Sequence, residues 1–311
     1  MTLALSPTTE FLDSTDLLND PPALRARADE LGYLFFRGLL PVDELIDVRR
    51  RILQVLDRRG WILPGTDPME GRADKAAYAA VPQEEIDFCG VGVGAEAYRE
   101  IQHLEAFHQL AHHPRLLSVY QTLFGEPVLP HPRNIARIVI PTDHDLPTPP
   151  HQDFIHIQGS KDVWTAWFPL GDCPVELGPL TCLVGSAADG LLTYKQAGGP
   201  GGLEAYLCDL GHSWAIGDYR AGDVLTFNSH TVHRALPNTE GEHVRLSCDF
   251  RYQPASAGIN DASLKVHCEV DTWESIYAGW EDHSRDYYWR DHDLQLREWN
   301  EALRWQKNRI C

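Results

Sequence analysis

The chain has 311 residues, of which 43% are hydrophobic, and its formal net charge is −18, from 45 acidic and 27 basic residues. This length is enough for one large core, and the acidic balance argues against a partner that is a nucleic acid or an anionic membrane surface. No segment approaches the ~18 apolar residues that a membrane-spanning helix needs, and the start lacks the pattern of a signal peptide, so we expect a soluble, cytoplasmic protein.

The first third of the chain is predicted to be helical. Apolar residues recur every three or four positions in 21–36 and in 41–60, and the second stretch begins at Pro41 and ends at Gly60. Between these helices, "YLFFRGLL" is short and aromatic, which predicts a strand. Two more helices are expected in "GAEAYREIQHLEAFHQLAH" and "HPRLLSVYQTLFG", where Gly125 supplies the stop.

From about residue 132 to 255, short β-type runs alternate with turn clusters, which predicts a β-sandwich or barrel. The runs are "NIARIVIP", "VWTAWFPL", "LTCLVG", "DVLTFN" and "HVRLSCDFRYQ". The glycine-rich "QAGGPGG" at 196–202 lacks the flanking strand and helix of a phosphate-binding turn, so we expect a surface loop. The tail mixes aromatic and charged residues at roughly helical spacing, which predicts helices packed on the sandwich.

No repeat or linker divides the chain, so we expect a single domain over 1–311. Its parts are a helical N-terminal part over about 20–125, a β core over about 126–255 and a helical C-terminal part over about 270–308. The seven cysteines are widely spaced and include no Cys-x-x-Cys pair. We therefore expect reduced thiols, mostly in the core, and neither a disulfide framework nor a zinc cluster.

A candidate metal site begins at His151 and Asp153, just before the run "VWTAWFPL". Side chains at i and i+2 of a strand point to the same side, so the two can converge on one ion. Two histidines and one carboxylate are a common ligand set for non-haem iron. With 15 histidines in the chain, one His-x-Asp pair is weak evidence alone, and a third ligand has to lie elsewhere. The stretch "TFNSHTVHRALPN" offers His230 and His233.

Taken in this order, the segments resemble the phytanoyl-CoA dioxygenase family of iron(II)- and 2-oxoglutarate-dependent oxygenases. The resemblance covers most of the chain and is carried by "ELGYLFFRGLLPVDEL", "HPRLLSVYQTLFG", "HQD", "TAWFPLGDCPVELGPLTCLVGS" and "GDVLTFNSHTVHRALPN". It implies a mainly β fold with bracing helices, whose core is a double-stranded β-helix of the jelly-roll, cupin-like type. It also implies Fe(II) as the metal, with 2-oxoglutarate and O2 as co-substrates.

The same match places the iron ligands at His151, Asp153 and His233, because the histidine followed by Arg-Ala-Leu-Pro-Asn corresponds to the family's distal ligand. Arg245, twelve residues further on, corresponds to the arginine that pairs with the distal carboxylate of 2-oxoglutarate. The physical argument agrees, because a sequestered guanidinium needs an anionic partner and its planar fork holds a carboxylate by two hydrogen bonds.

Three more residues are predicted to contact the co-substrate. Ser247 shares the face of Arg245 and is expected to donate a further hydrogen bond, and Trp167 corresponds to the aromatic residue beside the co-substrate. Asn134 is predicted to reach its inner carboxylate. The chain departs from the family pattern at Ala187 and Ala235, where a histidine and a small hydroxyl residue are usual, and neither change removes iron binding.

These observations predict a dioxygenase that hydroxylates an unactivated carbon of a small-molecule metabolite and releases succinate and CO2, with desaturation or cyclisation left open. Asp153 argues against a halogenase, which has a small residue in place of the carboxylate. The alternatives are a cupin-like iron dioxygenase without 2-oxoglutarate, in which Arg245 has no special role, and a non-catalytic binding module on the same fold. We expect a small-molecule substrate and no nucleic-acid or membrane partner, and nothing in the sequence indicates an oligomeric state.

Overall fold

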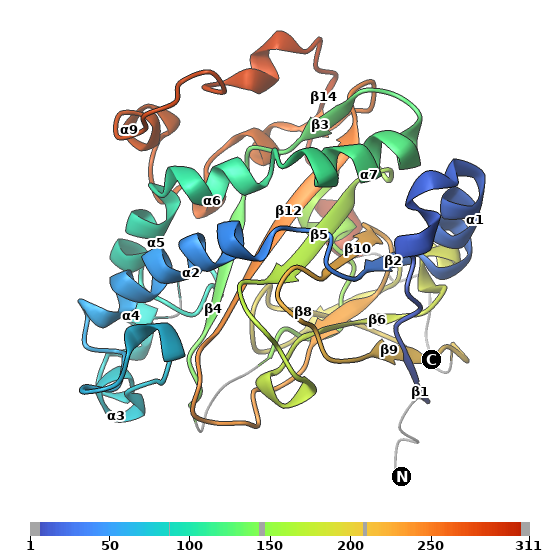
Figure 1. Cartoon of the computed structure of the whole chain (residues 1–311). Helices are drawn as coiled ribbons and strands as arrows, with labels where there is room; N and C mark the ends of the chain where they lie inside the picture. Colours follow the sequence, from blue (N-terminus) through green and yellow to red (C-terminus); the bar gives the residue numbers. More distant parts are fainter. Residues whose placement is uncertain (1–6, 87, 143–146, 208–209, 306–311) are drawn as a thin grey trace.

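The computed structural model describes residues 7–86, 88–142, 147–207 and 210–305. Two β-sheets face each other, and helices cover the outer side of the larger sheet (Figure 1). The fold is the double-stranded β-helix with bracing helices that the sequence predicted. The strand predicted at "YLFFRGLL" and the β-type runs between 132 and 255 all form strands.

The larger sheet has six strands in the order β2-β10-β5-β12-β3, and β4 also pairs with β12. Its strands are β2 (Tyr33–Phe36), β3 (Val128–Pro130), β4 (Ile135–Val139), β5 (Trp164–Pro169), β10 (Val224–Asn228) and β12 (Arg245–Pro254). Along β12, the even-numbered Leu246, Cys248 and Phe250 belong to the core under the helices. Because side chains alternate along a strand, the odd-numbered residues face the other way, into the space between the sheets.

The smaller sheet has the order β1-β9-β6-β11. Its strands are β1 (Thr8–Glu10), β6 (Leu180–Leu183), β9 (Trp214–Ile216) and β11 (His233–Ala235). Two short pairs complete the β structure, β7 (Tyr194–Gln196) with β8 (Leu203–Ala205) and β13 (Ile259–Asn260) with β14 (Leu296–Arg297). A second core lies between the two sheets and includes Phe35, Trp167, Cys182 and Phe227.

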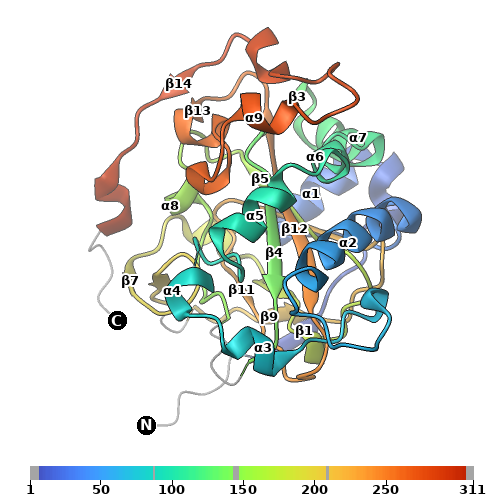
Figure 2. The same ribbon diagram turned by 90° about the vertical axis from the view of Figure 1, so that its left-hand side faces the viewer.

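The longer helices before the β core pack against the larger sheet, and two short ones of five and four residues lie near one end of it (Figure 2). They are α1 (Pro21–Leu31), α2 (Val42–Asp57), α3 (Lys75–Ala79), α4 (Gln83–Ile86), α5 (Ala95–Gln102), α6 (Glu105–Leu110) and α7 (Pro114–Phe124). The Asp20 carboxylate accepts a hydrogen bond from the Ala23 amide at the start of α1, and Gly125 ends α7 with a left-handed φ of 72°. Among the described helices, even the longest, α2, is not long and apolar enough to cross a membrane.

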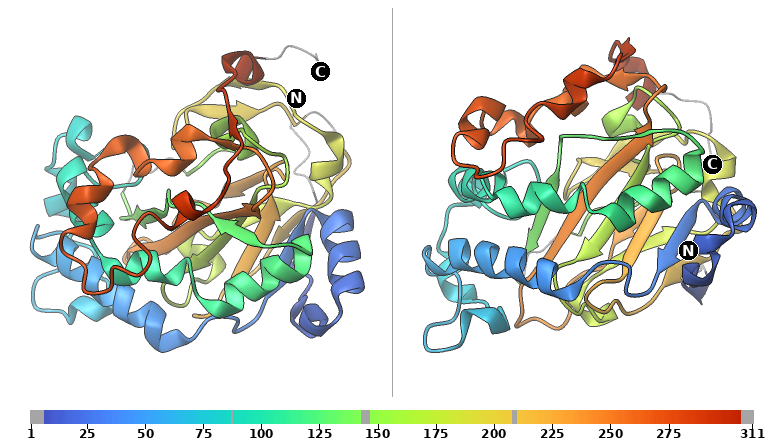
Figure 3. Two further views of the ribbon diagram at one scale, coloured as in Figure 1. Left: turned by 90° about the horizontal axis from the view of Figure 1, so that it is seen from above. Right: turned by 45° about the horizontal axis from the view of Figure 1, so that its top comes forward.

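Two helical predictions differ from the structure. The helix expected at 94–112 is divided at His103 and Leu104 into α5 and α6. The described part of the tail contains the five-residue α9 (Trp273–Tyr277), short 3-10 turns and the two-residue strand β14, and it crosses α5, α6 and β3 as an extended strap (Figure 3). Many of its hydrogen bonds go to other segments, such as the one from the Tyr288 hydroxyl to the Pro130 carbonyl. In the tail, these tertiary contacts take the place of the backbone hydrogen bonds of a helix.

The prediction for the cysteines was right for some and wrong for others. Three described cysteines are buried free thiols: Cys173, Cys182 and Cys248. Cys89 and Cys268 form a disulfide instead, with Cα atoms 6.4 Å apart across a sequence separation of 179 residues. Sequence spacing could not show this pair, because only the folded strap brings Cys268 to the segment before α5. Cys208 and Cys311 lie outside the described residues.

Candidate metal centre and co-substrate pocket

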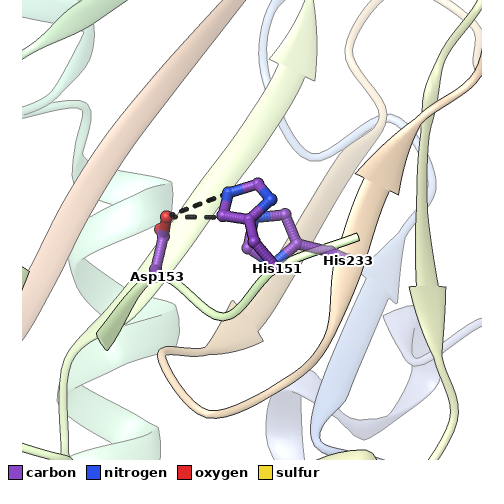
Figure 4. Close-up of side chains that lie close together, drawn as sticks. All are labelled: His151, Asp153 and His233. Atoms are coloured by element: carbon purple, nitrogen blue, oxygen red, sulfur yellow. Dashed lines mark ion pairs between the residues drawn. The ribbon is translucent and has the colours of Figure 1, made fainter. Parts of the chain in front are cut away.

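His151, Asp153 and His233 lie together between the two sheets (Figure 4). The backbones of His151 and His233 exchange two hydrogen bonds, of 3.0 and 2.9 Å, which sets the two imidazoles side by side. Asp153 comes two residues after His151, and its Oδ1 is 3.8 Å from the Nε2 atom of each histidine. All three side chains are buried. The strand geometry predicted for this pair is wrong, because Asp153 has helical φ and ψ at the start of α8 (Phe154–Ile157) and does not lie on a strand.

The two histidines are held in the neutral form with Nε2 unprotonated. Nδ1 of His151 is 2.8 Å from the Pro149 carbonyl oxygen, and Nδ1 of His233 is 3.0 Å from the Thr231 carbonyl oxygen. A carbonyl oxygen can only accept, so each Nδ1 donates and each Nε2 keeps a lone pair directed at Asp153. Burial lowers the pKa of His151 to about 3 and also lowers the pKa of His233, so both rings stay neutral.

This donor set fits a ferrous ion. One nitrogen of each imidazole and a carboxylate oxygen lie within 4.8 Å of one another. All three atoms are acceptors, and none of the three groups carries a hydrogen that it could donate to the other two. A cation resolves this arrangement, and neutral imidazoles with a carboxylate suit a borderline divalent metal.

Two residues that were not predicted from the sequence hold the Asp153 carboxylate in place. The Thr165 hydroxyl on β5 donates to its Oδ2 at 2.6 Å, and the Arg251 guanidinium on β12 lies 3.4 Å from both carboxylate oxygens. Burial acts to raise the pKa of Asp153, but the Arg251 guanidinium and the hydrogen bond from Thr165 outweigh it and hold that pKa well below its ordinary value. The carboxylate is therefore charged and oriented before a metal binds.

Two of the four predicted co-substrate residues line the pocket beside the triad, and a third contacts one of these two. Arg245 and Trp167 line it together with the triad, and the guanidinium carbon of Arg245 is 5.7 Å from the centre of the Trp167 ring. The Ser247 hydroxyl accepts a hydrogen bond of 2.9 Å from Arg245 Nη1, so it braces the arginine directly.

Arg137 on β4 and Asp249 on β12 form a further ion pair in the wall of this pocket. Arg137 Nε donates to Asp249 Oδ2 at 2.8 Å, and Arg137 Nη1 donates to the Gly90 carbonyl at 3.1 Å. The second carboxylate oxygen of Asp249 is buried without a hydrogen-bond partner among the described groups. The sequence held a signal for two of the missed residues, since Asp249 and Arg251 follow Arg245 and Ser247 at intervals of two.

Asn134 does not lie in this pocket. Its side chain donates to His108 Nδ1 at 3.1 Å and lines a separate small cavity under the C-terminal strap, so the structure does not bring Asn134 together with the other predicted co-substrate residues. Asn134 precedes β4, and the inward-facing residue of that strand is Arg137, which pairs in register with Ser247. His230 also lies outside the triad, stacked on Phe154 with ring centres 4.6 Å apart, which agrees with the choice of His233.

The chain is similar to known proteins over most of its length. The family model of phytanoyl-CoA dioxygenase (PhyH) matches residues 28–245. Two relatives are named 1-deoxypentalenic acid 11-beta-hydroxylase. The one from Streptomyces arenae is 29% identical over 264 residues, covering 80% of this chain and 86% of the relative. The one from Streptomyces exfoliatus is 27% identical over 261 residues, with the same coverage of 80% and 86%.

Solved structures share the fold. The epimerase SnoN, in complex with Fe3+, alpha ketoglutarate and nogalamycin RO, has a TM-score of 0.51 at 23% identity and covers 77% of this chain and 87% of its own. EctD from S. alaskensis, with 2-oxoglutarate and 5-hydroxyectoine, has a TM-score of 0.50 at 18% identity and covers 83% of this chain and 86% of its own. At these identities the likeness establishes the arrangement of the two sheets and their helices.

Proposed function

Because the chain belongs to the phytanoyl-CoA dioxygenase family, we propose that it hydroxylates an unactivated carbon of a small molecule, with His151, Asp153 and His233 as iron ligands and Arg245 as the anchor of 2-oxoglutarate. The enzyme is an iron- and 2-oxoglutarate-dependent dioxygenase. The observation that carries the assignment of residues is the meeting of two imidazole lone pairs and a charged carboxylate in one pocket with a braced arginine.

The overall reaction consumes one substrate, one 2-oxoglutarate and one O2. One oxygen atom enters the C–H bond of the substrate as a hydroxyl, the other enters succinate, and CO2 is released. The bound ferrous ion supplies the activation of oxygen that this chemistry requires. The chain supplies the geometry and the exclusion of water that directs the reaction to one carbon.

Each residue of the pocket has a separate task in this scheme. Arg245 holds the distal carboxylate of 2-oxoglutarate by paired, charge-assisted hydrogen bonds. Ser247 accepts from Arg245 and keeps its hydroxyl hydrogen for a further bond to the same carboxylate. Trp167 packs beside Arg245 and covers the co-substrate with an apolar surface. Thr165 and Arg251 hold Asp153 in its orientation toward the metal.

The kind of substrate is a small molecule, as the names of the relatives and neighbours indicate. The relatives named above act on 1-deoxypentalenic acid, and hydroxylation remains our proposal for this chain, with desaturation or cyclisation as variants of the same chemistry. The cytoplasmic location expected from the sequence stays a prediction, as does the single-domain organisation over 1–311.

The test is the turnover and binding of 2-oxoglutarate. Anaerobic calorimetry on the iron-loaded protein measures its affinity, and succinate formation in air measures its slow decarboxylation without substrate. We expect Arg245→Leu to weaken 2-oxoglutarate binding by about 30-fold or more, since a sequestered carboxylate loses its charged partner at a cost of about 2–5 kcal/mol. Iron affinity should stay unchanged.

The exposed Arg220 provides the matched control, because Arg220→Leu removes the same side chain from the surface. Unchanged 2-oxoglutarate affinity in Arg245→Leu would favour the cupin-like alternative. A wild-type protein that binds iron and 2-oxoglutarate but forms no succinate with any small-molecule candidate would favour the non-catalytic module.

A further inference from the structure

A second, larger cavity opens from the metal pocket. The metal pocket has a volume of about 30 Å³, and the adjoining cavity about 260 Å³. Four residues line both spaces: Arg137, Thr148, Ala235 and Arg245. A molecule in the larger cavity therefore borders directly on the site where the proposed function places iron and 2-oxoglutarate.

The walls of this cavity combine apolar side chains with a comparable amount of polar surface. Its apolar side chains come from segments far apart in the sequence and include Val81, Ile86, Val91, Ile138, Ile140 and Leu236. The predicted surface loop at 196–202 contributes Gly199 and Pro200 to the wall. A space of this size suits a compact ring system, since sites for drug-sized ligands range from about 300 to 1,000 Å³. The long chain of an acyl-CoA thioester would not be enclosed.

Arg137 is the charged group that this cavity offers besides Arg245, which the co-substrate occupies. No acidic side chain among the described residues lines the cavity. The Asp249 carboxylate that pairs with Arg137 lines the metal pocket instead. The ion pair of Arg137 with Asp249 therefore lies on the side of the metal pocket, and the guanidinium has further N–H groups that it can donate into the larger cavity.

The orientation of Arg137 is set without a ligand. Asp249 holds its Nε and the Gly90 carbonyl holds its Nη1, and 21% of the side chain remains exposed. A guanidinium only donates hydrogen bonds, so its complement must be an acceptor, and a carboxylate matches its planar fork best. A group that is already oriented also loses less entropy when it binds.

We propose that the 260 Å³ cavity binds the substrate, that the substrate is a compact apolar carboxylic acid, and that Arg137 holds its carboxylate. This inference rests on the proposed function, because it takes the metal pocket as the place of reaction. Arg137 is then a specificity-determining residue, and the apolar walls present one carbon of the ring system to the metal pocket.

The test uses binding of defined probes without turnover. The protein is loaded with Ni²⁺ and saturating 2-oxoglutarate, so that the metal and Arg245 are occupied, and is titrated calorimetrically with adamantane-1-carboxylate and with the neutral 1-adamantanemethanol. We expect the acid to bind about 10- to 100-fold more tightly than the alcohol. In Arg137→Gln this preference should vanish through loss of acid binding alone, and Arg137→Lys should keep part of it.

Two further variants guard against a trivial result. The double variant Arg137→Gln/Asp249→Asn removes both charges of the pair. It should therefore fold even if Arg137→Gln alone, which leaves Asp249 without a partner, does not. The double variant should also lose the preference for the acid over the alcohol. Arg133→Gln, in the same segment but outside the cavity and bonded to the Ala262 carbonyl, should retain it. Thermal melting checks the fold of each protein.

The proposal is overturned if neither probe binds to the wild type, if acid and alcohol bind equally, or if both Arg137 variants that lack the charge keep the preference for the acid. Failure of the proposed function has a different signature. There, the iron protein would form no succinate, while the nickel protein would still bind the acid in an Arg137-dependent way.

Discussion

The exchange Asp153→Asn separates a metal ligand from a structural residue. The amide has nearly the shape of the carboxylate and can still accept a hydrogen bond, so the loss of one charge is the main change. Asp153 occupies the N-cap position of α8, where Asn is as good as Asp. Its side chain accepts no capping hydrogen bond there, however. A capping role therefore cannot account for this carboxylate.

The structure sets the size of the expected effects. Arg251, with a side chain 8% exposed, has its contacts to Asp153 at 3.4 Å, and removal of one partner of a buried ion pair costs about 3–5 kcal/mol. The contacts are longer than the 2.7–2.9 Å of strong charge-assisted bonds, so we expect about 3 kcal/mol and a fall in melting temperature of about 5 °C. Loss of a residue that only orients a ligand costs about 10- to 100-fold in metal affinity, so loss of the anionic ligand itself should cost at least about 100-fold.

Anaerobic titration with Co²⁺ or Fe²⁺ measures the metal affinity, and thermal melting of the metal-free protein measures the stability. The exposed Asp162, nine residues further on, is the matched control, and Asp162→Asn should change neither quantity. An Asp153→Asn protein that binds metal within threefold of the wild type and melts at the same temperature would refute both the ligand assignment and the coupling to Arg251.

Two further predictions concern the same centre. We expect His233→Ala to abolish tight metal binding, because two remaining ligands do not define a coordination geometry, and His230→Ala to preserve it, because that ring stacks on Phe154 outside the triad; metal content after gel filtration decides, and the opposite pattern would show that the wrong histidine was chosen. We expect Arg251→Met to lower Co²⁺ affinity by about 10- to 100-fold and Arg251→Lys to restore part of it, because Arg251 orients Asp153; equal affinity of wild type and Arg251→Met would limit Arg251 to a structural role.

The sequence was sufficient to predict which residues meet in this pocket, the triad and Arg245, because each is marked by a local pattern. His151 and Asp153 are separated by a single residue in the motif "HQD", and His233 and Arg245 occupy fixed places in a family segment. The alternation of β12 also pointed to Asp249 and Arg251, since charged residues at intervals of two must share the face of Arg245. The prediction for this strand extended only to Ser247 and so did not include these two residues.

The position of Asn134 could not be predicted from local sequence patterns. The sequence identified a strand in this segment, but which residue faces the pocket depends on register, and a shift of one residue turns every side chain to the other face. Only the pairing of β4 with β12 shows that Arg137 stands opposite Ser247, and that Asn134 lies outside the strand.

The contacts between distant segments were decided by tertiary structure alone. Three features bring together parts of the chain whose contact no local sequence pattern predicts. They are the Cys89–Cys268 disulfide, the extended course of the tail and the cavity beside the metal pocket. Hydrophobic period and turn residues determine which strands and helices form, because those are local properties of the backbone and its side chains. Which wall residues meet around 260 Å³ of space depends on how the sheets and helices pack, and that is a property of the whole fold.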